Sequence, residues 1–589
     1  MRDRFWRTLS LLLALLIGLL PILSLRHAAA QTLGRRDVLL ATLDDVALED
    51  LLATPGFFSL AQQGGAALLV TTGPADSLRE VRDGFDGLPR GNLFVGGFPT
   101  VDLGSMTDDD GVVSPDRLGA AAAELAAILD GSAAGAELVL LASGSPPATA
   151  EAAGDHLGAL LMAEGSPSDL AEAIRAGATA ASVNTLTSDS TRREGVVASS
   201  DLIRTAIAFT GLLVASAPGG EPIRVVDGPP PLELHERYVQ SKRLTVPVGT
   251  FAALFAGIAS LLGIVVLLRW RSPSWLRRSS ALLAMSIPFL ALSLLLVGHL
   301  PSLTYTTVLP FVVATTAIGT LALVPVARRW GTLAAVAAAG VILLVALIVE
   351  AALGWTAALT PLLGGSQLDG GRFFGLPNAF IGLLLGGSLY VAQRLPRVDG
   401  TILIAAAGLF AGSPWTGSNI GAAVTLFAAA GIWWGLRGGL VWWRTAIAAV
   451  AAITAGTILV VIAHRYLTSA ETHITTFSEH TGGVAGLWNK FVHRLGVGLD
   501  LIVDNPFALL PVIGVLVMLG VVLRPPGPIR RSFEAVPVWR LALLTIVVGS
   551  VVAYLVNDSG AAAIGEGLTT SLAGMLYVSL RLREDMMTS

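Results

Sequence analysis

Charged and amide side chains interrupt the apolar second half of this chain at only a few places, and these residues could do chemistry. Asp558 stands in the motif Asn557–Gly560 between two apolar runs. An ionisable side chain in an apolar span is costly unless it faces a cavity or a partner. Asp558 is therefore a candidate catalytic base. Candidate substrate-binding residues in the same half are Asp369, Arg372, Asn378 and Asn557.

Two further polar segments follow this pattern. Asn419 joins two apolar runs, and the Thr-rich interval His464–Arg494 carries His480 and Lys490. We interpret His480 as a second candidate base, and Lys490 and Asn419 as groups that hold an anionic or polar substrate. The alternative is an ordinary set of polar loops, with Asn557–Gly560 as a turn that joins two helices.

The composition indicates the solvent in which these residues lie. Of 589 residues, 53% are hydrophobic and 14% are charged, where a soluble protein has roughly 25% charged residues. The net charge of −4 offers no basic surface for nucleic acid, and no glycine motif predicts a bound nucleotide. The lack of cysteine excludes disulfides and thiolate metal sites. The chain is therefore predicted to be an α-helical polytopic membrane protein whose main partner is the lipid bilayer.

Apolar runs that could cross a hydrocarbon core of about 30 Å divide the chain into three parts. One run lies in the N-terminal segment 1–30, which is either a retained signal anchor or a cleaved signal peptide. Residues 31–243 have the composition of a globular domain, and residues 244–589 form a transmembrane helical domain of about eleven spans. With the first segment this makes about twelve spans. The spans predicted in the third part are Val246–Leu268, Ala281–Val297, Thr304–Val326, Leu333–Leu353, Ala379–Val391, Ile402–Gly412, Ile420–Leu436, Thr445–Ile462, Phe507–Leu523, Leu541–Val556 and Ala561–Leu580.

The arginines predict how these spans are oriented. With the N-terminus in the cytoplasm, every inner loop carries arginine, for example Arg269, Arg328 and Arg524. This pattern predicts a multi-pass protein of the plasma (inner) membrane with both termini cytoplasmic. Residues 31–243 are then extracytoplasmic, and the candidate residues above all lie on the outer side.

Residues 31–243 show apolar strands that alternate with helices. This alternation predicts an inserted extracytoplasmic α/β domain with a doubly wound sheet. The strands are predicted within Arg36–Asp45, Ala66–Thr72, Glu137–Ala142 and Leu157–Ala163. The helices are predicted at Phe57–Gln63, Ala120–Leu129 and Asp201–Thr210.

One segment of this domain, Ser188–Arg193, combines hydroxyl side chains with the adjacent arginines Arg192 and Arg193. Guanidinium groups beside hydroxyls match the geometry of a phosphate group, so both arginines are candidate substrate-binding residues. A solvated turn rich in Ser and Thr is the alternative.

The domain resembles the alkaline phosphatase superfamily in a reduced form. Its opening carries Asp44-Asp45, Thr54-Pro55 and Gly65-Ala66 in the order that the superfamily uses. Four motifs further on resemble a family of bacterial polytopic membrane proteins that carry such a domain. These motifs are Leu186–Val197, Gly371–Asn378, Gly417–Gly421 and Asn557–Gly560.

The resemblance implies a site for two divalent metals and a hydroxyl nucleophile. It suggests Asp44, Asp45 and His156 as metal ligands and Thr72, or its neighbour Thr71, as the nucleophile. The chain departs from the superfamily at Ser143–Ser145, where an Asp-His pair is expected. The identity of the cofactor therefore stays an open question, and a divalent metal is the one cofactor that the resemblance implies.

Three functions fit these observations. The first is a membrane protein of the cell envelope that binds or processes a lipid-linked or phosphate-bearing envelope substrate at the outer membrane–water interface. The second is a transporter or flippase of an amphipathic substrate. The third is a non-catalytic membrane scaffold with a degenerate phosphatase-like binding domain. Whether the chain is an enzyme stays open.

Overall fold

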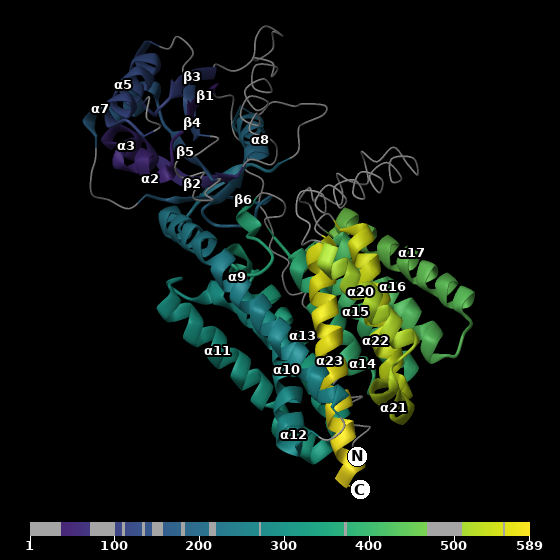
Figure 1. The fold of residues 1–589 in the computed structure, drawn as a ribbon. Helices are drawn as coiled ribbons and strands as arrows, with labels where there is room; N and C mark the ends of the chain where they lie inside the picture. Colours follow the sequence, from purple (N-terminus) through teal and green to yellow (C-terminus); the bar gives the residue numbers. More distant parts are fainter. Residues whose placement is uncertain are drawn as a thin grey trace.

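The computed structural model shows an α/β domain joined to a helical bundle by one long helix (Figure 1). The N-terminal segment, where the anchor or signal peptide is predicted, lies outside the described residues. The described residues are 37–70, 100–108, 112–131, 136–143, 157–177, 183–210, 220–269, 272–369, 374–467, 509–557 and 560–588.

A mixed β-sheet forms the centre of the α/β domain. Its strands are β1 (Asp37–Asp44), β2 (Gly64–Val70), β3 (Thr100–Ser105), β4 (Ala136–Ser143), β5 (Gly158–Glu164), β6 (Thr185–Ser188), β7 (Val196–Ala198) and β8 (Ile223–Val226). They lie in the order β3-β1-β4-β5-β2-β6-β8, and β7 pairs with β2. The strands predicted from the sequence correspond to β1, β4, β5 and β2 at the centre of this order.

The directions of two strands, β5 and β8, differ from the prediction of a doubly wound sheet, since β8 is antiparallel to β6. β1 is parallel to β3 and β4, whereas β5 is antiparallel to both of its neighbours, β4 and β2. β5 is the next described strand after β4 and pairs with it directly. The α/β class is confirmed, but the sheet is mixed.

Helices cover both faces of this sheet. Leu39 and Ala41 of β1 enter a core with α2, α3, α5 and α7, whereas Val38 and Leu40 enter a second core with α8. Successive side chains of a strand point to opposite faces, so the two cores lie on opposite sides of the sheet. The helices are α2 (Leu48–Ala53), α3 (Pro55–Gln62), α5 (Pro115–Gly131), α7 (Pro167–Ala176) and α8 (Ser199–Thr210).

The long helix α9 (Pro231–Leu268) links the two parts. Tyr238 is fully buried in the core of the α/β domain. Leu244 packs in a cluster with the next two helices, and Val266 belongs to the main core of the bundle. Because one continuous helix contributes to all three cores, the α/β domain is held in a fixed place on the bundle.

Each of the eleven apolar runs predicted as spans in the third part of the chain coincides at least in part with a helix. The bundle helices after α9 are α10 (Ser274–Leu296), α11 (Tyr305–Leu321), α12 (Leu323–Trp330), α13 (Thr332–Ala352), α14 (Ile381–Ala392), α15 (Arg397–Gly412), α16 (Ile420–Arg437), α17 (Trp442–Leu467), α20 (Leu509–Leu523), α21 (Gly527–Ala535), α22 (Pro537–Val556) and α23 (Gly560–Thr588). Short 3-10 turns, η1 (Val297–His299), η2 (Thr356–Leu359), η3 (Gln367–Asp369) and η4 (Asn378–Phe380), lie between them.

Seven of the described helices are long and apolar enough to cross a membrane, or eight if a bent pair counts as one span. The pair is α20 and α21, which meet at 63° after the prolines Pro525 and Pro526, which cannot continue a helix. The runs at α14 and α15 form helices of 12 and 16 residues, short of the roughly 20 that a span needs. The structure thus supports a multi-pass membrane protein, whereas the number of about twelve spans stays a prediction.

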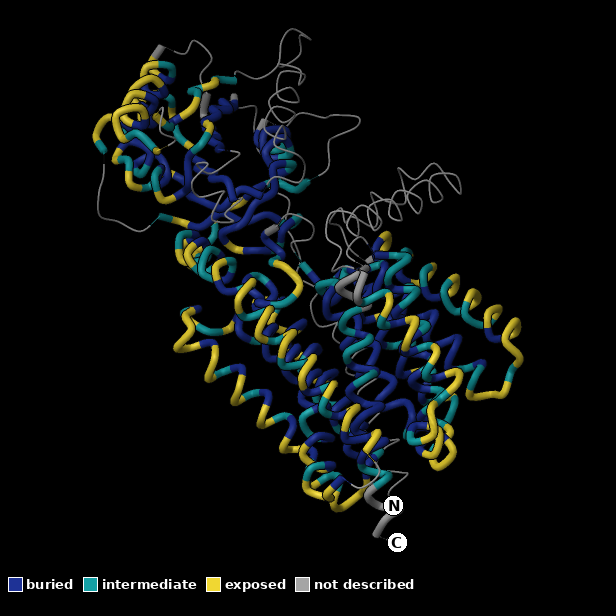
Figure 2. The backbone as a smooth tube through the Cα atoms, viewed as in Figure 1, coloured by how far each residue is buried: buried dark blue, intermediate teal, exposed yellow. Residues whose placement is uncertain are grey.

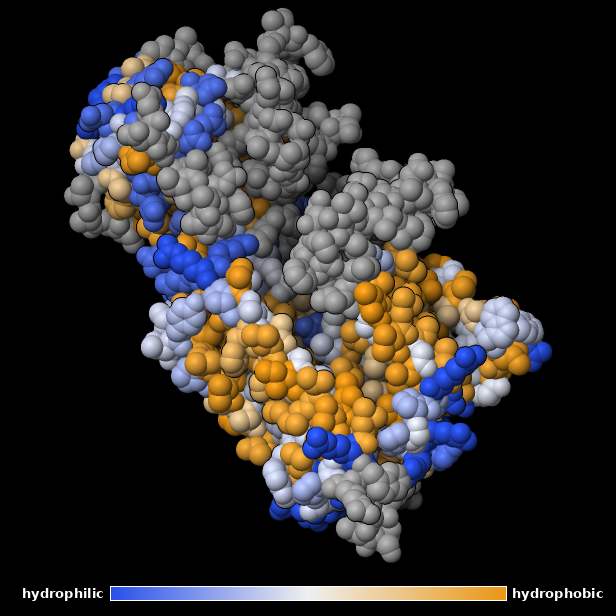
Figure 3. Space-filling view, in the orientation of Figure 1, coloured by the Kyte–Doolittle hydropathy of each residue, from blue (hydrophilic) through white to orange (hydrophobic). Residues whose placement is uncertain are grey.

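Polar residues gather at the two ends of the bundle, with a hydrophobic band between them (Figure 3). We call the end next to the α/β domain the domain end. Arginines of the predicted inner loops lie at the opposite end, where Arg583 donates to the carbonyl of Leu267 at 2.6 Å and Arg397 stacks on Trp434 at 3.6 Å. α9, α11 and α17 expose much of their apolar surface, while α14 is buried inside the bundle (Figure 2). This surface is suited to contact with lipid.

Candidate functional site

The loop between β6 and β7 presents Arg192 and Arg193, and a buried carboxylate shapes this loop. Asp201, in the first turn of α8, is fully buried and accepts hydrogen bonds from the hydroxyls of Ser188 and Ser190, each at 2.6 Å. Burial raises the pKa of Asp201, and these two hydrogen bonds oppose the shift. Arg192 has a left-handed backbone with φ of 54°, which turns the chain back toward β7.

Arg193 docks this loop on the bundle. Its Nη1 donates to the carbonyl of Gly354, and its Nη2 donates to the carbonyl of Trp355 at 3.2 Å and to Oε1 of Gln367 at 2.6 Å. Arg193 is only 5% exposed. Burial lowers the pKa of Arg193 to about 10, so the group stays charged at neutral pH.

Arg192 lies beside it and is less enclosed. Its Nη1 donates to the carbonyl of Pro414, and no other polar group of its side chain is hydrogen-bonded within the described part of the chain. The guanidinium carbons of Arg192 and Arg193 lie 4.9 and 5.7 Å from the centre of the Phe374 ring. Burial lowers the pKa of Arg192, and the carboxylate of Asp189 opposes this shift. Two cations therefore share one aromatic ring at the domain end.

The buried carboxylate of Glu350 offsets part of this charge. Glu350, near the end of α13, is 1% exposed, and its electrostatic attraction opposes the lowering of the Arg193 pKa. Its Oε1 accepts from the backbone N–H of Ala357 at 2.7 Å, and its Oε2 lies 2.6 Å from Nε2 of His299. Glu350 is absent from the residues predicted above, although it is the one acidic residue in the apolar helix Thr332–Ala352 and such residues indicate function.

Trp355 fixes the loop that receives Arg193. Its backbone is left-handed, with φ of 62°, and its indole N–H donates to the carbonyl of Thr416. Its ring centre lies 6.4 Å from that of Phe410. The loops after α13 and after α15 are thereby tied together under the arginines.

The predicted asparagines meet in the same region. Asn419 caps α16 by accepting from the N–H of Ala422 at 2.9 Å, and its Nδ2 donates to Oδ1 of Asn378 at 2.9 Å. Asn557, at the end of α22, lies against Gly421, where an added Cβ would overlap its Oδ1. That Oδ1 is buried and accepts no hydrogen bond within the described residues.

We call this arrangement the interdomain joint. It unites five of the eight predicted substrate-binding residues. Its members are Arg192, Arg193, Glu350, Trp355, Gln367, Phe374, Asn378, Asn419 and Asn557.

The other predicted residues are placed as follows. Asp369 is the last residue of η3, two positions after Gln367 of the joint. Six of the predicted site residues lie outside the described residues, and these are Thr72 (or its neighbour Thr71), His156, Arg372, His480, Lys490 and Asp558.

Asp44 and Asp45 stand at the carboxyl end of β1, where the sequence predicted them. Asp45 has φ of 60°, and its Oδ2 accepts from the hydroxyl of Ser105 at 2.7 Å. Across the described ranges, no three His, Cys, Asp or Glu side chains lie close enough together to hold a metal. Since His156 lies outside these ranges, the metal site stays a prediction.

No protein-family model, curated protein or solved structure matches this chain. The resemblance to the alkaline phosphatase superfamily therefore stays a prediction as well. A function for this chain has to be inferred from the geometry of the joint.

Proposed function

We propose that this chain is a multi-pass protein of the plasma membrane that binds a lipid-linked or phosphate-bearing envelope substrate at the outer membrane–water interface. In this proposal the domain end is the outer end, and the α/β domain is extracytoplasmic. The interdomain joint holds the phosphate of the substrate.

The observation that carries this proposal is the pair of guanidinium groups over Phe374. Like charges so close disfavour each other, and Arg192 contributes to the lowered pKa of Arg193. The carboxylates that attract them have partners of their own, since Glu350 pairs with His299 and Asp189 pairs with Arg224. A phosphate group would relieve this surplus of positive charge, and the remaining N–H donors of Arg192 could bind it.

A non-catalytic scaffold is the second candidate, and Arg193 is the observation that favours it. Three protein acceptors already bind its guanidinium, so this side chain acts as a docking group. The two candidates differ in Arg192. A scaffold leaves its free donors without a ligand, whereas a substrate-binding protein uses them.

The test is the binding of a polyprenyl phosphate by the full-length protein in detergent micelles, with the neutral polyprenol as the reference ligand. We expect the phosphate to bind more tightly than the alcohol. Arg192→Gln should weaken binding of the phosphate by about 10- to 100-fold, because one charge-assisted hydrogen bond is worth about 1.5–3 kcal/mol.

The matched control is Arg175→Gln, which removes an exposed arginine that pairs with Asp130 on the α/β domain. It should leave binding unchanged. Equal affinity for phosphate and alcohol in the unmodified protein would refute the proposal and leave the scaffold. Release of inorganic phosphate during the same titration would show that the chain is an enzyme.

A further inference from the structure

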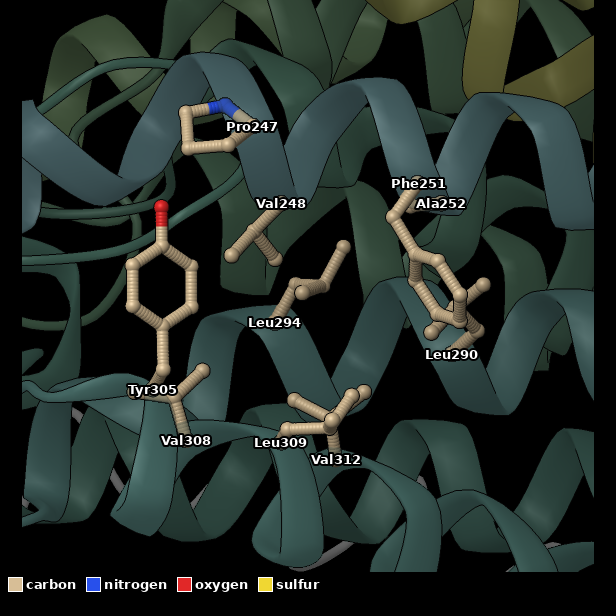
Figure 4. A pocket seen from close by; sticks show the side chains of 10 residues that line it. All are labelled: Pro247, Val248, Phe251, Ala252, Leu290, Leu294, Tyr305, Val308, Leu309 and Val312. Atoms are coloured by element: carbon tan, nitrogen blue, oxygen red, sulfur yellow. The ribbon is translucent and has the colours of Figure 1, made fainter.

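An apolar groove runs between α9, α10 and α11 on the surface of the bundle (Figure 4). Two adjoining cavities of about 200 and 450 Å³ form it, and both are lined by Phe251, Leu290 and Val312. The larger volume lies within the range of roughly 300–1,000 Å³ that is usual for small-molecule sites. The shared residues make the two cavities one continuous groove.

The groove offers little polar surface to an occupant. The hydroxyl of Ser286 donates to the carbonyl of Leu283 and that of Thr320 to the carbonyl of Thr316, both at 2.7 Å. The hydroxyl of Thr316 lies 3.2 Å from that of Ser293. These hydroxyl groups are therefore engaged within the protein, and the groove suits a hydrocarbon chain.

The rims of the groove face the hydrophobic band of the bundle. Leu254 and Ile258 on α9, and Leu309 and Val313 on α11, each leave half or more of their surface exposed. Such side chains on a membrane-spanning bundle contact lipid, because exposing them to water would be costly. The groove therefore opens toward the acyl chains of the surrounding lipids.

A phenol and a cation stand where the groove ends, at the domain end. Pro247 and Tyr305 face each other there, and the Tyr305 hydroxyl points toward α9 (Figure 4). Arg243 precedes Pro247 by one helical turn, so it lies on the same side of α9. Arg243 is exposed, and its side chain has no polar partner in the described part of the chain. A cation and a phenol above an apolar groove match the phosphate and acyl chain of a lipid.

We propose that this groove binds one anionic phospholipid of the leaflet nearest the α/β domain. An acyl chain lies along Phe251, Leu290 and Val312, and the phosphate lies between Arg243 and the hydroxyl of Tyr305. This inference does not depend on the proposed function, because the groove and the interdomain joint share no residue.

The experiment is native mass spectrometry of the full-length protein, titrated with phosphatidylglycerol or with phosphatidylcholine of identical acyl chains. The unmodified protein should retain one phosphatidylglycerol in preference to phosphatidylcholine. Arg243→Gln should reduce this preference about fivefold, since one cation near the surface is worth about 1 kcal/mol toward an anionic lipid. The substitution alters one exposed side chain and keeps the fold.

A second variant tests the acyl chain. Ala252→Trp fills the groove from α9 and should abolish the retained lipid. Leu261→Trp is its control on the same helix, because Leu261 is 62% exposed and lines neither cavity. Retention of the lipid by both Trp variants would overturn the site. Equal retention of the two lipids by the unmodified protein would overturn the role of Arg243.

Discussion

Arg193 provides the sharpest test of the interdomain joint. Replacement by Met keeps an apolar stem of similar length but removes the guanidinium. The acceptors on Gly354, Trp355 and Gln367 then lose their donor inside the protein. Leaving a buried acceptor without its donor costs about 1–3 kcal/mol, and three acceptors are affected here. The free energy required to open the loop that follows α13 should fall by about this amount, so the loop should open more often.

Hydrogen exchange measures that opening directly. In this loop the N–H of Ala357 is bonded to Glu350 at 2.7 Å and that of Ala358 to Trp355 at 3.1 Å. These amides exchange when the loop opens, so a loss of about 3 kcal/mol predicts roughly 100-fold faster exchange. The assay is exchange followed by mass spectrometry on the full-length protein in detergent, read on peptides that cover residues 353–369.

The control is Arg175→Met, which breaks an exposed ion pair with Asp130. Pairs of this kind are worth about 0–1 kcal/mol, so the loop should exchange as in the unmodified protein. If Arg193→Met exchanges no faster than Arg175→Met across residues 353–369, then Arg193 does not dock the α/β domain and the reasoning is wrong.

Two further predictions concern packing and pH. Gly421→Ala should destabilise the protein by about 1–3 kcal/mol in thermal unfolding, because the new Cβ overlaps Oδ1 of Asn557. The control Gly520→Ala should leave the stability unchanged, because no atom lies within 4 Å of its Cβ. Equal melting temperatures for the two variants would contradict the packing of Asn557 against Gly421. Burial raises the pKa of Asp201 above its ordinary value of 3.8, so the folded state takes up a proton there before the unfolded state does. The contribution of Asp201 to stability is then full below that ordinary value and falls as pH rises through the raised pKa. The stability of the unmodified protein relative to Asp201→Asn, measured by chemical denaturation, should therefore increase as pH is lowered from 7 toward 4; a difference independent of pH would show that this carboxyl is not perturbed.

The sequence predicts those parts of the fold that local patterns determine. Apolar runs of strand length predicted β1, β2, β4 and β5, and long apolar runs predicted the bundle helices. The short strands β6, β7 and β8 have 4, 3 and 4 residues, too few for a period to be visible. The sequence pattern also does not predict the direction of β5, because strand direction depends on which strands pair and not on the residues of one strand.

The candidate site was predictable residue by residue but not as an arrangement. The composition of Ser188–Arg193 indicated an anion-binding loop, and the polar breaks in the apolar half indicated Asn378, Asn419 and Asn557. Their meeting place depends on contacts such as Arg193 with Gln367, which are 174 positions apart in the chain. Periodicity and composition within a short window carry no information on such pairs, so only the three-dimensional structure reveals the joint.

The joint and the lipid groove are two sites on one rigid frame, and their independence can be measured. α9 connects them, since Tyr238 lies in the core of the α/β domain and Leu244 in the cluster beside the groove. Their side chains do not touch, so the costs of Arg193→Met and Ala252→Trp should add to within about 0.5 kcal/mol in the double variant. A larger deviation would mean that α9 transmits a change from one site to the other. Lipid in the groove would then alter phosphate binding at the joint, and phosphate would alter lipid binding by the same factor, because coupling between two binding sites is reciprocal.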